Sequence, residues 1–393
     1  QSFATFAFFE RYYNEIFPQL WESDALTDYN GTVNYTFAQL ATQIERLHIL
    51  FERLGILPGD KIAICGRNCA NWAVAYLAIT TYGAVVVSIL HDFKPEDVVS
   101  LLRHSDSKML FVGPYMWKTL GPLFASISEN SQSENSDLGA LTNAVSLSDF
   151  SVLFDKNATN VHSLSDIEDT FHKRYPNGYQ KTDVHYRDDN YDDLMLINYT
   201  SGSMGAPKGV MLSYRSLSGN VFSGHKYLPN RPGQKIVSML PLAHMFGQLA
   251  EFLFPLSGGC HIYFLVQTPT PSLLMRAFAD VHPYMIVTVP LIIEKICKRQ
   301  VFPITNKAVF QKLWNAPLGI GALVRKKVKN KILKSFGNKL QYFIVGGAGI
   351  NEDVERFLLS IHFPLCVGYG MTECGPLIGG STLQEFVARS SGH

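Results

Sequence analysis

The sequence predicts an α/β protein built on a doubly wound, mainly parallel sheet. Short apolar segments alternate with helical segments along the chain, and the links between them are short. Strand–helix–strand units with short links place successive strands parallel and put the helices on the faces of the sheet. A composition of 47% hydrophobic and 17% charged residues excludes wholesale disorder. At about 150 residues per domain, this length suggests two or three lobes.

The alternation is clearest between residues 60 and 113. An almost continuously apolar segment at its centre is typical of a strand covered on both faces, and Gly83 suits the left-handed end of a helix. The next helix begins at Pro95, and its first turn carries two acidic residues that favour the helix dipole. The elements expected here are a strand at 61–65, a helix at 71–83, a strand at 84–90, a helix from 95 and a strand at 108–113.

Two polar stretches, 126–149 and 176–193, are rich in polar and acidic residues and lack periodicity, which indicates surface loops. The second ends in the acidic run DDNYDD, and the chain then becomes apolar at Leu194, where we expect a boundary between lobes. Further strands are expected at 194–198, 236–240, 260–266, 285–289 and 342–347, with helical segments between them.

Charge and hydropathy exclude several classes of function. The chain has 34 basic and 33 acidic residues, a balance that argues against broad nucleic-acid binding, which needs a concentrated basic surface. The most apolar window, 249–266, contains a glutamate, a proline and two glycines, so no clean membrane span is expected. The six cysteines follow neither a zinc nor a disulfide pattern. We therefore expect a cytoplasmic protein without nucleic-acid partners.

A glycine-rich segment follows the strand expected at 194–198. Residues 199–209 read YTSGSMGAPKG, and three glycines in it let backbone N–H groups converge on an anion, with hydroxyls and a lysine nearby. It is not a Walker A loop, because the lysine follows Pro207 rather than a glycine. The ordinary alternative is a Gly/Ser turn. The residues expected to contact phosphate are Thr200, Ser201, Gly202, Ser203, Gly205 and Lys208.

This segment resembles the signature loop of the adenylate-forming superfamily, which includes acyl-CoA synthetases, luciferases and the adenylation domains of peptide synthetases. The family loop usually carries Thr or Ser where this chain has Met204, so one possible hydroxyl contact to the β/γ-phosphates is missing. Two further family motifs follow in the expected order: GGA at 346–348, directly after a predicted strand, and GYGMTE at 368–373.

The resemblance implies a role for each of these motifs. The GGA backbone lines the adenine and acyl pocket, the ring of Tyr369 covers adenine, and the Thr372 hydroxyl meets the α-phosphate. Glu373 and Thr200 are the implied ligands of Mg²⁺, which prefers hard oxygen donors. Read alone, Glu373 would be a solvated acid at a helix start. The nucleotide-binding residues implied outside the glycine-rich segment are Gly346, Gly347, Ala348, Tyr369, Gly370 and Thr372.

His244 lies in the segment PLAHMFG, which in the family faces the carboxylate and acyl side of the site. A lone histidine is usually structural, but an imidazole in this position can orient a carboxylate or shield the reacting centre. Amino-acid adenylation would need a buried acid here to pair with the substrate ammonium, and the segment has none. Catalytic roles are therefore expected for Lys208, His244, Thr372 and Glu373.

Residues 240–265, with GYGMTE, look most like the long-chain fatty acyl-CoA synthetase branch of the family. The resemblance implies a fatty acid as substrate, with ATP, Mg²⁺ and CoA. The carboxylate attacks the α-phosphorus of Mg-ATP to give acyl-AMP, and the CoA thiol then displaces AMP. Apolar residues of 236–266 are candidates for an acyl tunnel, although most are expected to be core. Two alternatives stay open: a ligase for aryl or shorter-chain acids, and an inactive nucleotide- or lipid-binding module.

The resemblance covers nearly the whole chain, which corresponds to the large N-terminal domain of the family. It implies two doubly wound, mainly parallel sheets packed with helices in one AMP-binding domain over 1–393. We expect a first α/β subdomain at roughly 60–193 and a second made of 194–393 together with about 1–59. In the family, a ribose-binding Asp, a hinge and a small C-terminal domain with a Lys follow GYGMTE. We expect these to be absent, and hence weak nucleotide binding and slow turnover.

Residues 325–339, which read RKKVKNKILKSFGNK, contain seven basic residues. A solvated helix is the commonest explanation for such a run. A membrane-surface face is a second, since long acyl substrates partition into lipid, and contact with the nucleotide tail of CoA is a third. Peripheral contact with the inner face of a membrane therefore stays open beside the cytoplasmic location.

Overall fold

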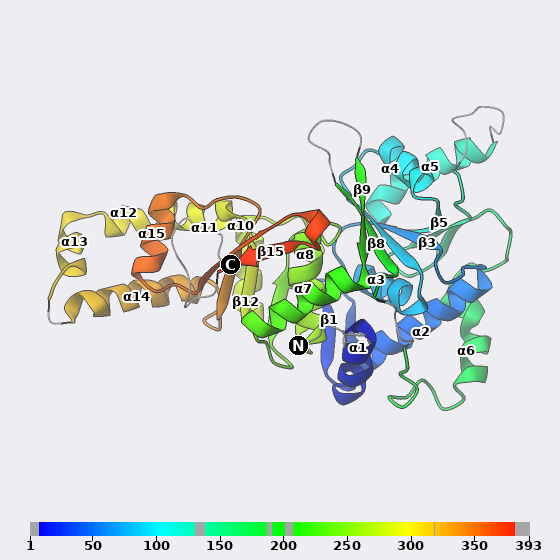
Figure 1. The fold of residues 1–393 in the computed structure, drawn as a ribbon, viewed down its shortest axis with the longest axis horizontal. Coiled ribbons are helices and arrows are strands. Elements are labelled where there is room, and N and C mark those ends of the chain that lie inside the picture. Colours follow the sequence, from blue (N-terminus) through cyan, green and yellow to red (C-terminus); the bar gives the residue numbers. More distant parts are fainter. Residues whose placement is uncertain (1–7, 130–137, 187–190, 201–206, 318, 382–393) are drawn as a thin grey trace.

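The computed structural model describes residues 8–129, 138–186, 191–200, 207–317 and 319–381. Figure 1 shows three parts along the longest axis: an arm of helices at one end, the eight-stranded sheet with its helices in the middle, and the seven-stranded sheet at the other end. The α/β class and the two sheets packed with helices are confirmed.

The first sheet has seven strands, and its central five are parallel. Its strands in chain order are β3 (Lys61–Cys65), β4 (Val85–Ile89), β5 (Ser107–Val112), β6 (Asn143–Ser146), β7 (Val152–Asp155), β8 (Leu194–Thr200) and β9 (Lys208–Ser213). The order across the sheet is β7-β6-β5-β3-β4-β8-β9, so β3 lies between β4 and β5 as a doubly wound sheet requires. The two edge strands, β7 and β9, are antiparallel to their neighbours.

The second sheet has eight strands in the order β15-β14-β13-β12-β10-β11-β1-β2, and all but its two edge strands are parallel to their neighbours. Its strands in chain order are β1 (Asp24–Tyr29), β2 (Asn34–Thr36), β10 (Lys235–Ser238), β11 (His261–Leu265), β12 (Met285–Thr288), β13 (Tyr342–Val345), β14 (Leu365–Gly370) and β15 (Leu377–Gly380).

Helices cover both sheets. The α-helices in chain order are α1 (Phe8–Gln19), α2 (Phe37–Arg53), α3 (Ala70–Tyr82), α4 (Pro95–His104), α5 (Pro114–Glu129), α6 (Glu168–Arg174), α7 (Tyr214–Tyr227), α8 (Met245–Gln248), α9 (Phe254–Ser257), α10 (Pro271–Val281), α11 (Pro290–Ile296), α12 (Phe302–Thr305), α13 (Ala308–Trp314), α14 (Ile320–Ser335) and α15 (Glu352–Ser360). Two π-helical turns, Leu249–Leu253 and Cys297–Val301, link α8 to α9 and α11 to α12. Two 3₁₀ turns lie at Leu164–Ile167 and Thr372–Cys374. Among the described helices, none is both long and apolar enough to span a bilayer.

The helix α3 explains how the two sheets hold together. It is apolar on all sides, and it packs on β3 and β4 of the first sheet and on β1 of the second. Its polar groups also bind two other helices. The Tyr76 hydroxyl donates to Gln248 Oε1 of α8 at 3.1 Å, and the carbonyl of Thr80 accepts from the Tyr214 hydroxyl of α7 at 3.0 Å. The helix ends at Gly83, whose φ of 87° is left-handed, as its sequence predicts.

The boundary expected at residue 194 does not match the sheets. The strands β8 and β9 pair in the first sheet, with Leu196 of β8 opposite Val86 of β4, so the second sheet takes its strands from 24–36 and from 235 onward. An apolar strand after a polar link can join the sheet that precedes it as readily as a new one. How the chain divides into domains stays a prediction.

The expected loop at 126–149 is also partly wrong. The helix α5 continues through Glu129, and β6 lies within the stretch. This strand escapes sequence analysis because it is short and polar: the side chain of Asn143 is buried and donates to Asp155 Oδ1 at 3.1 Å.

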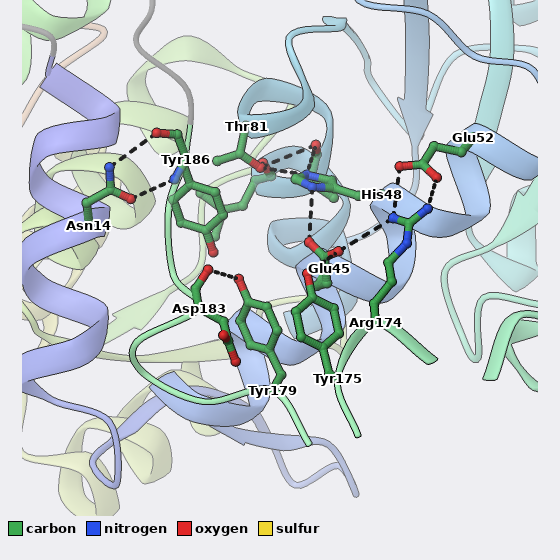
Figure 2. A network of polar contacts seen from close by, with 12 residues as sticks. Asn14, Glu45, His48, Glu52, Thr81, Arg174, Tyr175, Tyr179, Asp183 and Tyr186 are labelled. Carbon is green, nitrogen blue, oxygen red and sulfur yellow. Dashed lines mark hydrogen bonds and ion pairs between the residues drawn. The ribbon is translucent and has the colours of Figure 1, made fainter. Parts of the chain in front are cut away.

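A polar network fastens the connection that precedes β8 to the helix α2 (Figure 2). The guanidinium of Arg174 donates to both carboxylate oxygens of Glu52, at 3.1 and 2.5 Å, and the Tyr175 hydroxyl donates to Glu45 Oε1 at 2.8 Å. Burial and the neighbouring Glu45 carboxylate raise the pKa of Tyr175 above its usual range. These contacts hold the connection against α2 and have a structural role.

His261, at the start of β11, makes stability depend on pH. Burial lowers its pKa from 6.5 to about 4, although Asp24 nearby opposes the shift, and its Nε2 lies 2.7 Å from Thr27 Oγ1. As pH falls from 6.5 to 4 the unfolded chain binds this proton first, so the free energy of unfolding decreases. We expect the wild type to lose roughly 3 kcal/mol relative to His261→Gln across this range, measured by urea unfolding. Parallel pH profiles of the two proteins would contradict this.

Candidate active site

The parallel strands of the second sheet end at one edge, and we refer to the region outside their carboxyl ends as the crevice. After β10 comes the loop that carries His244, after β13 comes Gly346, and β14 ends in Tyr369 and Gly370. A Cβ on Gly346 would lie 2.8 Å from the ring of Phe246 and 3.4 Å from the carbonyl oxygen of Gly368. These three sequence-predicted segments therefore come together, at the edge where open α/β sheets bind ligands.

The turn Thr372–Cys374 lies at the seam between the sheets. It packs against β9, and Asn220 of α7 holds both sides of it, donating to the carbonyl of Cys374 at 3.0 Å and accepting from the N–H of Leu377 at 2.8 Å. The glycine-rich segment is therefore brought beside the GYGMTE motif, since β9 begins at Lys208.

The two described ends of the glycine-rich segment are neighbours. Thr200 is the last residue of β8 and pairs with Lys208 of β9, so the segment leaves and re-enters the sheet at one point. Lys208 is exposed and Thr200 is half-buried. Four residues that were predicted to contact phosphate lie outside the described part of the chain, Ser201, Gly202, Ser203 and Gly205, and so does Met204.

His244 caps the short helix α8. Its Nδ1 accepts a hydrogen bond from the N–H of Phe246 at 3.3 Å, and the ring is exposed at the rim of the crevice. Desolvation by the surrounding protein lowers the pKa of His244 below 6.5. With Nδ1 as an acceptor, the neutral ring carries its proton on Nε2, which is a donor for a carboxylate or phosphoryl oxygen.

The loop that carries His244 is held by a buried carboxyl group that the sequence did not reveal. Glu251 Oε2 accepts from the N–H groups of Met239 and Leu240, both at 2.9 Å, and from the Ser238 hydroxyl at 3.1 Å. Glu251 is fully buried, and burial raises its pKa well above 4.5, although the hydrogen bonds from Leu240, Met239 and Ser238 oppose the shift. It lies in a π-helical turn, an irregularity that often accompanies functional sites.

Two asparagines, one next to β3 and one on β8 of the first sheet, also hold the loop that carries His244. Asn68 accepts from the N–H of Leu242 at 2.9 Å and donates to the carbonyl of Leu240 at 2.6 Å. Asn198 of β8 donates to the carbonyl of Ala243 at 2.7 Å. The position of His244 therefore depends on both sheets. In the sequence, the only indication of the Asn198–Ala243 contact was the polar Asn198 inside the apolar strand MLINYT.

The remaining predicted residues lie around the crevice. Gly347 and Ala348 are exposed, Tyr369 is 55% exposed, Thr372 is half-buried and Glu373 is exposed. Exposed backbone and an exposed aromatic ring can contact a nucleotide without rearrangement. The roles expected for these residues stay predictions.

The donors present suit Mg²⁺ better than a metal held by protein alone. In the described residues, no group of three or more His, Cys, Asp and Glu side chains could hold an ion. Mg²⁺ commonly binds through one or two protein oxygens plus substrate phosphates and water. The Glu373 carboxylate and the Thr200 hydroxyl fit that donor set.

A cavity of about 480 Å³ adjoins the crevice between α7, β14 and β15. Gly368, next to Tyr369, lies on its wall, and so do Ile344, Val367 and Leu377. The wall is mainly apolar but also includes Asn220 and Ser223, and because the cavity borders the backbone of GYGMTE it can take an apolar group attached to a ligand in the crevice.

Comparisons with known proteins agree with this fold. The structure is similar to that of the N-terminal domain of FACL13 from Mycobacterium tuberculosis, with a TM-score of 0.67 and 19% identity over 97% of this chain and 81% of that one. It is also similar to the anthranilate CoA ligase AuaEII in complex with anthranoyl-AMP, with a TM-score of 0.70 and 16% identity over 97% of this chain and 62% of that one. At these identities the likeness shows the fold.

Among sequences, long-chain-fatty-acid–CoA ligase 1 of Saccharomyces cerevisiae is 31% identical over 46% of this chain and 28% of its own length. Long-chain-fatty-acid–[acyl-carrier-protein] ligase AEE15 of Arabidopsis thaliana is 25% identical over 96% of this chain and 58% of its own. The chain spans about half the length of relatives that it matches throughout. The family model for the AMP-binding enzyme matches residues 19–392. The chain therefore belongs to the AMP-binding enzyme family.

Proposed function

We propose that this chain forms the large domain of a long-chain fatty acid–CoA ligase. The fatty-acid carboxylate attacks the α-phosphorus of ATP and displaces pyrophosphate, giving acyl-AMP. The CoA thiol then attacks the acyl carbon and displaces AMP, giving the thioester. Relatives named as long-chain-fatty-acid–CoA ligases support the reaction class.

The observation that carries the substrate class is the cavity beside the crevice. Its mainly apolar walls suit an alkyl chain whose carboxylate lies near His244, and each buried CH₂ contributes about 0.8 kcal/mol. An aryl acid would leave part of the volume of this cavity empty. A long alkyl chain uses more of it.

The residues around the crevice have separate tasks in this proposal. The His244 Nε2–H donates to the carboxylate and orients it, while Lys208 neutralises phosphate charge. Tyr369 stacks on adenine, and Thr372 donates to the α-phosphate. Mg²⁺, held by Glu373 and Thr200, supplies charge neutralisation on the phosphates when bound.

A chain-length profile tests the substrate class. We expect fatty acid-dependent ATP–pyrophosphate exchange by the full-length protein to increase with alkyl length and to peak with long-chain acids. Val367→Phe, which fills the cavity, should move the peak to shorter acids. Leu57→Phe, at a 61% exposed position away from the crevice, should leave it unchanged. A peak at aromatic acids would refute the proposal, and absence of exchange with any acid would favour a binding module.

A further inference from the structure

Charge is strongly segregated in this chain. Residues 295–339 contain twelve of the 34 basic residues and no acidic one, so the rest of the chain is net negative. This segment forms most of the helical arm from α11 to α14, at the end of the long axis far from the first sheet (Figure 1). A concentrated basic surface of this kind attracts anions over distances of about a Debye length.

The same arm exposes apolar side chains. Of the fifteen large apolar residues that are exposed in the described chain, six lie on the arm, between residues 291 and 323. The most exposed are Val309 of α13 at 73% and Leu323 of α14 at 62%. Single exposed apolar residues are ordinary, but a group of them on one projecting element marks an interaction site.

The basic and apolar groups share the outer face of α14. Leu323, Lys327 and Lys334 are all exposed and are spaced four and seven residues apart, so they lie along one side of the helix. The opposite side packs inward through Gly321 and Ile332. The helix is therefore fixed to the body of the protein, with its amphipathic outer side in solvent.

A groove of about 310 Å³ runs between α14 and the helices α12 and α13. Its walls are apolar, with Val301, Phe310 and Val328 among them, and Lys327 and Lys331 stand beside it. An apolar groove bordered by ammonium groups suits an acyl chain that ends in an anionic headgroup. For Lys326, Lys327 and Lys334 the described residues include no acidic partner.

We propose that this arm docks on an anionic lipid bilayer, with the outer side of α14 and the exposed end of α13 facing the headgroups. The lysines pair with lipid phosphates, and Val309 and Leu323 enter the acyl boundary. Charge complementarity selects a bilayer of anionic lipid over a neutral one, and projecting apolar side chains distinguish it from a purely ionic partner. The surface lies apart from the crevice, so the inference does not depend on the proposed ligase reaction.

Flotation of the purified chain with vesicles tests the docking surface. Vesicles of phosphatidylcholine with about 30% phosphatidylglycerol should bind the chain at least tenfold more strongly than phosphatidylcholine alone, because each lysine near an anionic surface strengthens binding about fivefold. Salt should weaken binding to the anionic vesicles.

Paired variants locate the contact. Lys326→Glu with Lys334→Glu should weaken binding to the anionic vesicles at least tenfold, and Val309→Ser with Leu323→Ser at least threefold. Two control pairs remove the same kinds of groups elsewhere: Lys156→Glu with Lys181→Glu, at exposed positions, and Leu57→Ser with Met211→Ser. The controls should bind as the wild type does. Unchanged thermal unfolding checks that each variant is folded.

Three results would overturn the proposal. One is equal binding to both kinds of vesicle, and another is an equal loss in the control and arm variants. The third is a concentration-dependent dimer, seen by sedimentation, that Leu323→Ser abolishes while vesicle binding stays intact, because the surface would then join two copies of this chain.

Discussion

Replacing Glu251 by alanine should lower the free energy of unfolding by about 3–5 kcal/mol, one of the largest effects expected of a single change in this protein. The substitution removes the acceptor of the Met239 and Leu240 N–H groups, and it opens a cavity at a fully buried position. Each buried donor left without a partner costs about 1–3 kcal/mol. Urea unfolding at neutral pH measures the effect.

Two further variants separate the causes. Glu251→Leu fills the volume but still lacks the acceptor, so it should remain destabilised, while Glu251→Gln keeps an acceptor oxygen and resembles the protonated acid. Because burial raises the pKa of Glu251, its contribution is complete at low pH and is lost as pH rises through the folded-state value. The wild type should therefore lose stability at high pH relative to Glu251→Gln. A glutamine variant as unstable as the alanine variant would show that Glu251 acts as a charged group.

Replacing Gly370 by alanine should weaken ATP binding about tenfold or more, an overpacking cost of about 1–3 kcal/mol at the GYGMTE motif. A Cβ here would lie 2.0 Å from the carbonyl oxygen of Pro376, and that oxygen accepts a hydrogen bond from the N–H of Met371 at 2.9 Å. Backbone cannot move aside as a side chain can. The turn that carries Thr372 and Glu373 must therefore shift.

Gly349→Ala is the matched control for this change. It alters a glycine that directly follows the GGA motif, and a Cβ there meets nothing within 4 Å. Titration with ATP followed by tryptophan fluorescence or calorimetry should give wild-type affinity for Gly349→Ala and reduced affinity for Gly370→Ala. Equal affinities in the two variants would contradict the role given to the motif.

The strands of both sheet centres follow directly from the sequence. Segments such as KIAIC and AVVVSIL are apolar throughout, and the structure gives β3 and β4 within one residue of the expected bounds. Burial on both faces of the sheet requires this apolar pattern, so the strand can be predicted without knowing which strands pair with it. The short edge strands β2, β7 and β15 were missed, because a strand that is paired on one side tolerates polar residues and glycine. The inner strand β6 was missed because it is short and polar.

The residues of the site also fall into two groups, those that the sequence predicted and those that only the structure revealed. The motif residues His244, Gly346 and Tyr369 are found because their spacing matches a family pattern, and the fold does bring their segments together. Glu251 and Asn68 carry no such pattern. Each holds backbone groups that are distant in the sequence or in an irregular loop, and only the folded chain shows which groups those are.

The sequence by itself determined the α/β class and the family, and it predicted residues of the crevice, because local periodicity and close motif spacing are written in neighbouring residues. The tertiary structure decided which sheet β8 joins, how buried polar groups position the loop of His244, and that the basic and apolar residues of the arm share one exposed side. These depend on pairing and packing between segments far apart in the chain, and a one-dimensional pattern does not record them.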